Sequence, residues 1–241
     1  ERNYIDFHKE ILSFIPRERV YDDEIRRFAW GTDAGFYRLV PQLVVRAANE
    51  TEVSRLMVSA SRYGVPVTFR AAGTSLSGQS VSDSVLVVAG KHWEDYTVLD
   101  NGSKIRLQPG VVGSRVNDIL RPYPRKFGPD PASIKSCMVG GIVMNNASGM
   151  SCGTTANSDR MLLDARIVFA DGSVLDTSDP QSRSMFIASH PEMISHILTL
   201  RDEIRSDNEL TQRIQHKYSI KNVTGLNILP FVTFDDPIEI V

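Results

Sequence analysis

The segment from Pro66 to Ser84, PVTFRAAGTSLSGQSVSDS, constrains the fold of this chain most strongly. A short apolar run, Pro66–Arg70, ends in a loop made almost wholly of small residues, and a second apolar run, Ser84–Val88, follows without a helix between them. Small side chains let successive N–H groups converge on an anion, and Gly73 and Gly78 can take positive φ at no steric cost. We therefore predict a strand, a phosphate-binding loop and a second strand.

Two familiar phosphate-binding loops are excluded here. A Walker loop places Gly-Lys-Ser/Thr at the start of a helix, a Rossmann fingerprint places G-x-G-x-x-G there, and neither pattern occurs in the chain. A small-residue loop taken alone is more often an ordinary surface turn. The phosphate-binding interpretation therefore depends on the rest of the chain.

Composition excludes several other classes of protein. With 241 residues, of which 41% are hydrophobic, the chain can bury a sizeable core as one large domain or two small lobes. With 27 Lys and Arg against 29 Asp and Glu, the chain has no excess of positive charge that would favour binding to nucleic acid or to a membrane surface. No apolar run approaches the roughly 18 residues of a spanning helix, and the chain opens with charge rather than with an apolar signal segment. We predict a cytoplasmic protein with no membrane span.

The cysteine count limits metal chemistry in the same way. Cys137 and Cys152 are too few for a disulfide scaffold, a tetrahedral zinc site or an iron–sulfur cluster held by this chain alone. We predict two thiols in loops and no metal site.

The remaining pattern predicts a mixed α/β sheet followed by two hairpins. An Asn-Gly between alternating apolar runs marks the first hairpin. The run 127–157 has no amphipathic period, and because irregular backbone must find hydrogen-bond partners that a ligand can supply, it is the second candidate site. The expected elements are helices over 4–14, from Asp22 onward, 51–64, 112–120 and 193–204, strands at 43–46, 66–70 and 84–88, and hairpins 96–108 and 161–176.

Four ordered pieces of the chain carry a family resemblance. They are Arg70–Gly78, Pro109–Val111, Gly128–Ala132, and Val139–Gly141 with Asn145–Gly149. Together they resemble the FAD-binding domain of the vanillyl-alcohol oxidase / p-cresol methylhydroxylase (PCMH-type) superfamily. Within it, the likeness is closest to the branch of FAD-linked D-lactate dehydrogenase, glycolate oxidase and D-2-hydroxyglutarate dehydrogenase. The likeness begins near residues 32–34, runs through 41–177 and resumes at 220–225.

The resemblance implies an α+β fold of two α+β lobes with the flavin between them. It divides the chain into an N-terminal helical segment, 1–35, and a PCMH-type FAD-binding domain, 36–241, that is incomplete at its C-terminal end and lacks the cap domain of the family. Catalytic residues and any iron–sulfur cluster would then lie in a missing C-terminal region, so none is assigned here, and this chain alone is expected not to turn over substrate.

The resemblance also implies which residues hold the cofactor. One group would cradle the pyrophosphate, and the others would line the rest of the flavin. The first group is Arg70, Ala71, Ala72, Gly73, Thr74, Ser75, Gly78 and Gln79, and the second is Pro109, Gly110, Asp130, Pro131, Ala132, Val139, Gly140, Gly141, Asn145, Asn146, Ala147, Ser148 and Gly149.

Two departures from the family pattern change the expectations. Many members have Gly-Gly-Gly where this chain has Ala71-Ala72-Gly73, so the backbone at both alanines should keep negative φ. Members that bind flavin covalently often have His where this chain has Thr74, so the FAD is expected to be non-covalent. The five histidines match no attachment site of the family and are expected at the surface.

The function implied by the resemblance is the FAD-binding part of an oxidoreductase that converts a D-2-hydroxy acid to the 2-oxo acid. The partners would be that small acid and an electron acceptor that the sequence does not identify. Two alternatives stay open: an enolpyruvyl sugar-nucleotide reductase of the same fold, and a nucleotide- or phosphate-binding module without redox activity.

Overall fold

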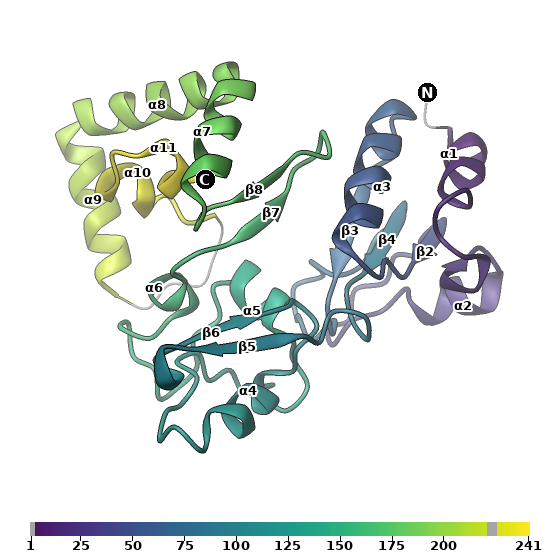
Figure 1. Cartoon of the computed structure of the whole chain (residues 1–241), viewed down its shortest axis with the longest axis horizontal. Coiled ribbons are helices and arrows are strands. Elements are labelled where there is room, and N and C mark those ends of the chain that lie inside the picture. Colours follow the sequence, from purple (N-terminus) through teal and green to yellow (C-terminus); the bar gives the residue numbers. More distant parts are fainter. Residues whose placement is uncertain (1–2, 221–225) are drawn as a thin grey trace.

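Figure 1 shows the computed structural model of the chain, which describes residues 3–220 and 226–241. The strands are β1 (Val20–Tyr21), β2 (Leu43–Val45), β3 (Val67–Arg70), β4 (Val85–Val88), β5 (Tyr96–Leu99), β6 (Lys104–Leu107), β7 (Arg166–Val168) and β8 (Val174–Asp176). The helices are α1 (Tyr4–Ile11), α2 (Glu24–Ala29), α3 (Glu50–Arg62), α4 (Gly113–Leu120), α5 (Val139–Met144), α6 (Ser158–Met161), α7 (Pro180–Ser189), α8 (Pro191–Ser206), α9 (Asn208–Ser219), α10 (Leu229–Thr233) and α11 (Pro237–Ile240).

The N-terminal lobe is built on a four-stranded sheet in the order β1-β2-β4-β3. The central strand β4 runs parallel to both β2 and β3, with Val85 opposite Leu43 on one side and Val67 on the other, whereas β1 is antiparallel to β2. All four residues of β4 are buried, as expected for a strand that is covered on both faces. The predicted mixed sheet is confirmed.

Alternate residues of β4 enter two different hydrophobic clusters, one on each face of the sheet. Val85 and Val87 belong to a large cluster with Phe7 of α1 and Leu56 of α3, so these two helices cover one face. Leu86 points to the other face, where partly buried aromatic residues pack against it. Because α1 and β1 share this core and this sheet, the predicted N-terminal segment 1–35 packs as part of the lobe, and its separation from 36–241 stays a prediction.

A buried ion pair fixes the start of α3 to the N-terminal segment. Arg19 donates to both carboxylate oxygens of Glu52, at 2.6 and 2.7 Å, and the Ala48 N–H donates to the same carboxylate at 2.8 Å. Burial raises the pKa of Glu52, but the hydrogen bonds from Arg19 and Ala48 outweigh it, so the pKa lies below its usual value. Asn49 accepts a hydrogen bond from the Glu52 N–H as the N-cap of α3.

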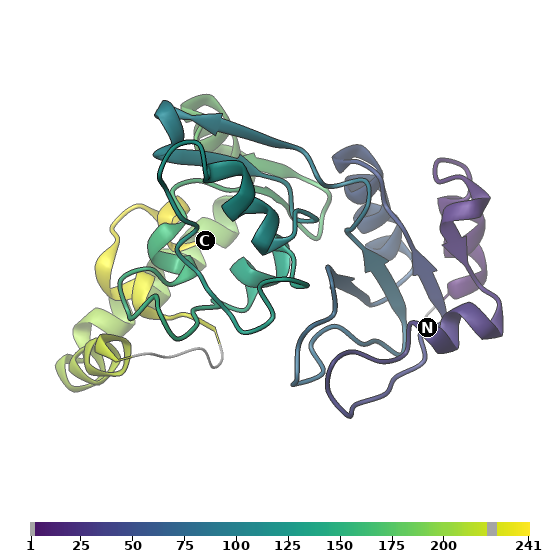
Figure 2. The ribbon, with the colours of Figure 1, turned by 90° about the horizontal axis from the view of Figure 1, so that it is seen from below.

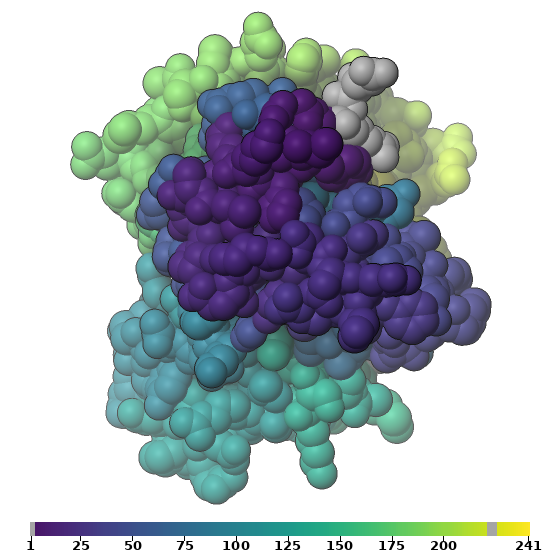
Figure 3. Space-filling view, turned by 90° about the vertical axis from the view of Figure 1, so that its right-hand side faces the viewer, coloured from purple at the N-terminus to yellow at the C-terminus, as the bar shows by residue number. Residues whose placement is uncertain are grey.

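The second part of the chain contains the two hairpins β5–β6 and β7–β8 with helices α4 to α11, and Figure 2 shows it beside the N-terminal lobe. The hairpin β7–β8 extends toward α3 (Figure 1). There Arg166 binds both carboxylate oxygens of Glu50, and the Ser54 hydroxyl donates to the Gly172 carbonyl. The hairpin therefore joins the two parts. Figure 3 shows the N-terminal helices in front, with the teal segment below them and the green helices above and behind.

Several local expectations need correction. The run 127–157 is not irregular throughout, because it contains α5, and the second hairpin begins at Arg166 rather than near Met161, because Ser158–Met161 forms α6. The helix α3 begins at Glu50, one residue before the predicted Thr51. Helices α7, α9, α10 and α11 were not expected. His190 is not a surface residue: its side chain is 17% exposed and its ring stacks on Phe186 at 4.1 Å.

Among the described residues, no helix is both long enough and apolar enough to cross a lipid bilayer. The cytoplasmic location stays a prediction.

Candidate flavin-binding site

The small-residue loop connects two neighbouring parallel strands, β3 and β4, without a helix between them, as predicted. Gly73 has φ +71° and Gly78 has φ +77°, so both occupy the left-handed region that favours glycine. Ala71 and Ala72 keep negative φ, which confirms the expectation for this departure from the family pattern. The loop therefore bends at its glycines and accommodates two methyl groups elsewhere.

The loop has backbone donors to offer. In the part of the chain that the structure describes, the N–H groups of Gly73, Thr74 and Ser75 donate no hydrogen bond to another residue. Ser77, by contrast, donates its N–H to the Ser75 hydroxyl at 3.2 Å. Donors without a protein partner, in a loop with small side chains, fit the oxygens of a pyrophosphate group.

Arg70, at the end of β3, turns back from the strand. Its Nη1 donates to the Thr32 carbonyl at 2.6 Å, and its guanidinium carbon lies 5.1 Å from the centroid of the Trp30 ring. Burial lowers the pKa of the Arg70 guanidinium, and the nearby Asp33 carboxylate opposes that effect. The guanidinium is thus fixed to the segment between α2 and β2.

The structure places the loop beside the C-terminal end of α5, from the second part of the chain. Gln79 Nε2 donates to Asn145 Oδ1 at 3.2 Å, and Asn145 is the C-cap of α5. A Cβ atom at Gly141 would lie 3.9 Å from the Ala71 Cβ, which is ordinary van der Waals contact. Two of the predicted pieces, far apart in sequence, therefore meet.

The remaining pieces attach to α5 and to the segment after it. The Gly140 N–H donates to the Pro109 carbonyl at 2.9 Å, and the Asp130 N–H donates to the Ser148 carbonyl at 2.5 Å. A Cβ atom at Gly149 would lie 1.8 Å from the Asp130 carbonyl oxygen, so only glycine fits there. All four pieces singled out by the sequence thus form one connected region.

The Asp130 carboxylate is held in place by two side chains. The Ser151 hydroxyl donates to Oδ2, and the Lys126 ammonium lies 3.1 Å from the same oxygen. These two groups, the hydroxyl first, hold the pKa of Asp130 below its usual value. Asp130 is therefore ionised at neutral pH and acts as a hydrogen-bond acceptor.

Several predicted residues have evident structural roles. Val139 is buried in a cluster with Val111, and Ser148 is 4% exposed. The Asn146 side-chain oxygen accepts from the Asp159 N–H at the start of α6. These side chains shape the region, and their contact with a flavin stays a prediction.

Residues 30–34 are not among the predicted site residues, yet the structure brings this segment against the loop. The Ala34 N–H donates to the Gly73 carbonyl at 3.0 Å. The signal available in the sequence was the family likeness, which begins at residues 32–34. The likeness at 220–225 falls almost wholly outside the described residues.

Two surface hollows lie elsewhere. One follows α9 and the other lies between α7 and the hairpin β7–β8. Neither is lined by a residue of the predicted flavin site.

Comparison with known proteins decides the family. Residues 41–178, more than half of the chain, match the family model described as an FAD binding domain. The chain belongs to this family of FAD-binding domains. The predicted cofactor is thereby confirmed as FAD, whereas its non-covalent attachment and the individual residues that contact it stay predictions.

The curated relatives are dehydrogenases and a subunit of an oxidase by name. The chain is 33% identical over 141 residues to glycolate oxidase subunit GlcD of Escherichia coli K12, covering 58% of this chain and 28% of that protein. It is 24% identical over 213 residues to D-2-hydroxyglutarate dehydrogenase of Haemophilus influenzae, covering 82% and 21%. It is 26% identical over 135 residues to D-lactate dehydrogenase of Archaeoglobus fulgidus, covering 56% and 30%. The chain spans less than a third of the length of each of these three relatives.

Solved structures show the same fold. Alkyldihydroxyacetonephosphate synthase matches with a TM-score of 0.62 at 20% identity, covering 73% of this chain and 36% of that chain. A 6-hydroxy-D-nicotine oxidase from Arthrobacter nicotinovorans matches with a TM-score of 0.59 at 17% identity, covering 68% and 36%. The predicted PCMH-type α+β fold is confirmed.

Proposed function

We propose that this chain holds FAD non-covalently, with the pyrophosphate on the loop 71–79 and the rest of the flavin along α5 and the segment after it. The observation that supports this most directly is the set of unpartnered N–H groups at Gly73, Thr74 and Ser75, in a family of FAD-binding domains. The bound flavin would supply a hydride acceptor, and the protein would supply orientation and hydrogen bonds.

We further propose that the chain is the flavin-binding part of an enzyme that oxidises a D-2-hydroxy acid, such as glycolate, D-lactate or D-2-hydroxyglutarate, to the 2-oxo acid. The names of the relatives support this class of substrate. The electron acceptor is left open, and no residue of this chain is assigned to proton transfer.

Flavin binding is tested first on the chain as it stands. FAD is added to the purified protein, excess is removed by gel filtration, and the absorbance spectrum of the protein peak is recorded. We expect a flavin spectrum in the protein peak. A protein peak without flavin, but with bound inorganic pyrophosphate by calorimetry, would favour the phosphate-binding module instead.

The substrate class is tested on the complete gene product. Dye reduction is measured with glycolate, D-lactate and D-2-hydroxyglutarate, and with the L-enantiomers of the two chiral acids as controls. Turnover with glycolate, or with a D-acid but not with its L-enantiomer, supports the proposal, and turnover with none of these acids by a flavin-loaded protein contradicts it. The chain of 241 residues, loaded with FAD in parallel, is expected to give no turnover.

A further inference from the structure

The Arg70 guanidinium lies directly against Gly73. A Cβ atom at Gly73 would lie 2.4 Å from Nη2, 2.5 Å from Cζ and 2.6 Å from Nε of Arg70. Three atoms of the planar group therefore lie in the space that a side chain at Gly73 would occupy. Gly73, the first of the three consecutive loop residues with unpartnered N–H groups, therefore lies against a cation.

In the described part of the chain, the Arg70 guanidinium donates its hydrogen bonds to backbone carbonyl oxygens. Nη1 donates to Thr32 at 2.6 Å and lies 3.4 Å from the carbonyls of Trp30 and Ser80. Across the described residues, Arg70 forms no ion pair with a carboxylate, and its buried Nε has no hydrogen-bond partner. A guanidinium stays charged in proteins, and a partly buried charge without a counter-charge is costly. An anion on the loop would offset that cost.

A second segment supports the same loop. Besides the bond between Ala34 and Gly73, a Cβ atom at Gly35 would lie 2.8 Å from the Leu76 carbonyl oxygen. The Tyr37 ring packs against Gly78, where an added Cβ would lie at 3.2 Å. This segment precedes residue 41, where the match to the family model begins.

Asp33 completes this support. Its Oδ1 accepts from the Gly35 N–H at 2.8 Å, and its Oδ2 lies 3.4 Å from the Ser80 hydroxyl. Its negative charge acts on Arg70 without an ion pair between them. The electrostatic field at the loop therefore depends on both side chains.

We propose that Arg70 and the segment 30–37 are positioning elements of the phosphate site, with Arg70 presenting its unpaired charge from beneath the loop to the pyrophosphate rather than binding it directly. This inference rests on the proposed function. Arg70 fixes the loop conformation through Gly73 and attracts the anion, while the charge of Asp33 partly opposes that attraction.

The test compares FAD with riboflavin, which has no phosphate, in titrations at several salt concentrations. Arg70→Met is expected to weaken FAD binding about tenfold or more, the scale of losing a charge-assisted interaction, and to leave riboflavin binding unchanged. It should also make the salt dependence of FAD binding shallower. Arg70→Lys keeps the charge and should keep the steeper salt dependence, although it binds more weakly than the wild type.

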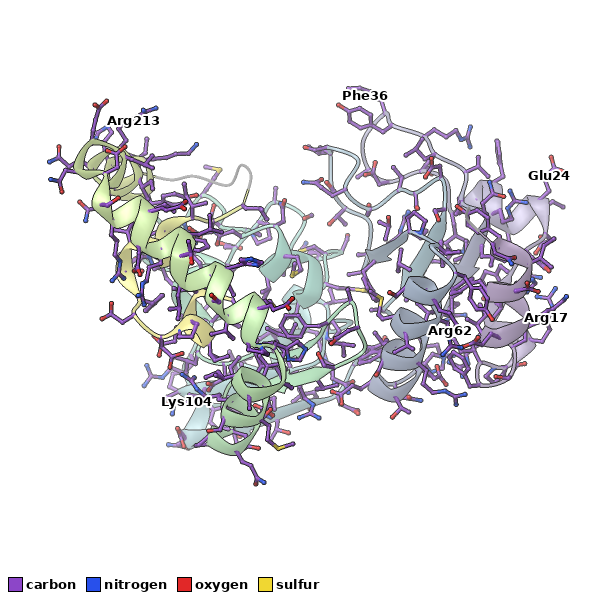
Figure 4. The ribbon with its side chains drawn as sticks, turned by 90° about the horizontal axis from the view of Figure 1, so that it is seen from above. Arg17, Glu24, Phe36, Arg62, Lys104 and Arg213 are labelled. Carbon is purple, nitrogen blue, oxygen red and sulfur yellow. The ribbon has the colours of Figure 1, made fainter. Side chains whose placement is uncertain are left out.

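Asp33→Asn gives an effect of opposite sign. The amide oxygen can still accept from the Gly35 N–H, but the opposing charge is gone, so FAD should bind a few-fold more tightly, on the order of the effect of one partly screened charge. A purely structural role would predict weaker binding. Arg213→Met is the matched control, because Arg213 lies on α9 in the other part of the molecule, far from the loop that carries Phe36 (Figure 4). Circular dichroism checks folding of every variant.

The outcomes separate the two proposals. If Arg70→Met binds FAD as tightly as the wild type, or loses FAD and riboflavin equally, the inference fails while FAD binding stands. If Arg70→Met does not fold, Arg70→Lys and Asp33→Asn decide: weaker binding by Asp33→Asn contradicts the inference. If the wild type binds neither FAD nor inorganic pyrophosphate, both proposals fail.

Discussion

Replacing Gly73 with alanine should weaken FAD binding in two ways that the structure separates. At φ +71° an alanine pays about 1–2 kcal/mol for a left-handed backbone. Its Cβ would also lie 2.4 Å from Arg70 Nη2, so the guanidinium must move and lose its bond to Thr32, at about 1 kcal/mol. The sum is about 2–3 kcal/mol, and because 1.4 kcal/mol is tenfold, FAD affinity should fall roughly 30- to 150-fold.

Gly153→Ala provides a matched control for this prediction. Gly153 has φ +59°, but nothing lies within 4 Å of an added Cβ, so it tests the backbone cost without the collision. FAD affinity is measured by quenching of flavin fluorescence, and the free energy of unfolding by urea titration. Wild-type FAD affinity in a folded Gly73→Ala variant would refute the placement of the pyrophosphate on this loop. If Gly73→Ala and Gly153→Ala lowered FAD affinity equally, the contribution of the collision with Arg70 would be refuted.

Three further predictions concern other contacts. Glu52→Gln should destabilise the fold by about 3 kcal/mol, because it leaves the Arg19 guanidinium buried without its counter-charge. Since the pKa of Glu52 is lowered in the folded state, the stabilisation by its carboxylate is present above the unfolded pKa of about 4.3 and disappears as pH falls through the folded pKa. Urea titrations from pH 7 to 3 would show this loss. Gly149→Ala should cost about 3 kcal/mol or more, since φ is +117° and its Cβ would overlap the Asp130 carbonyl; unfolding at the wild-type urea midpoint would contradict this. With Thr74 in place of an attachment histidine, acid precipitation of the flavin-loaded chain should leave the flavin in the supernatant, and a washed pellet that stays yellow would show a covalent bond.

The parts of the fold that could be predicted are those whose conformation is determined by residues adjacent in the sequence. Gly73 and Gly78 were identified as positions able to take positive φ, which they do, and Ala71 and Ala72 were expected at negative φ, because the steric limits of each residue type act within its own backbone. The hairpin around Asp100 followed from Asn-Gly between alternating runs in the same way.

The helix α5 shows why other parts could not be predicted. Its sequence, Val-Gly-Gly-Ile-Val-Met, includes two glycines, each of which costs about 1 kcal/mol in a helix, and it is too short for an amphipathic period. Its first turn is held from outside: the Val139 N–H donates to the Val111 carbonyl, and the Gly140 N–H donates to Pro109. Tertiary hydrogen bonds overrode a local preference that pointed to irregular backbone.

The support beneath the loop escaped prediction for a related reason. Arg70 binds the carbonyls of Trp30 and Thr32, and Ala34 binds the carbonyl of Gly73, so most of the bonds between the two segments use backbone atoms that every residue type provides. Such bonds leave no side-chain pattern in the sequence. Only Gly35 and the charged side chains leave a signal, because a Cβ at Gly35 would collide with the loop and Arg70 requires a nearby carboxylate or anion. If the proposed phosphate site is correct, a boundary drawn at residue 35 or 41 divides it, and a chain trimmed to the matched family residues should lose loop order and FAD affinity together.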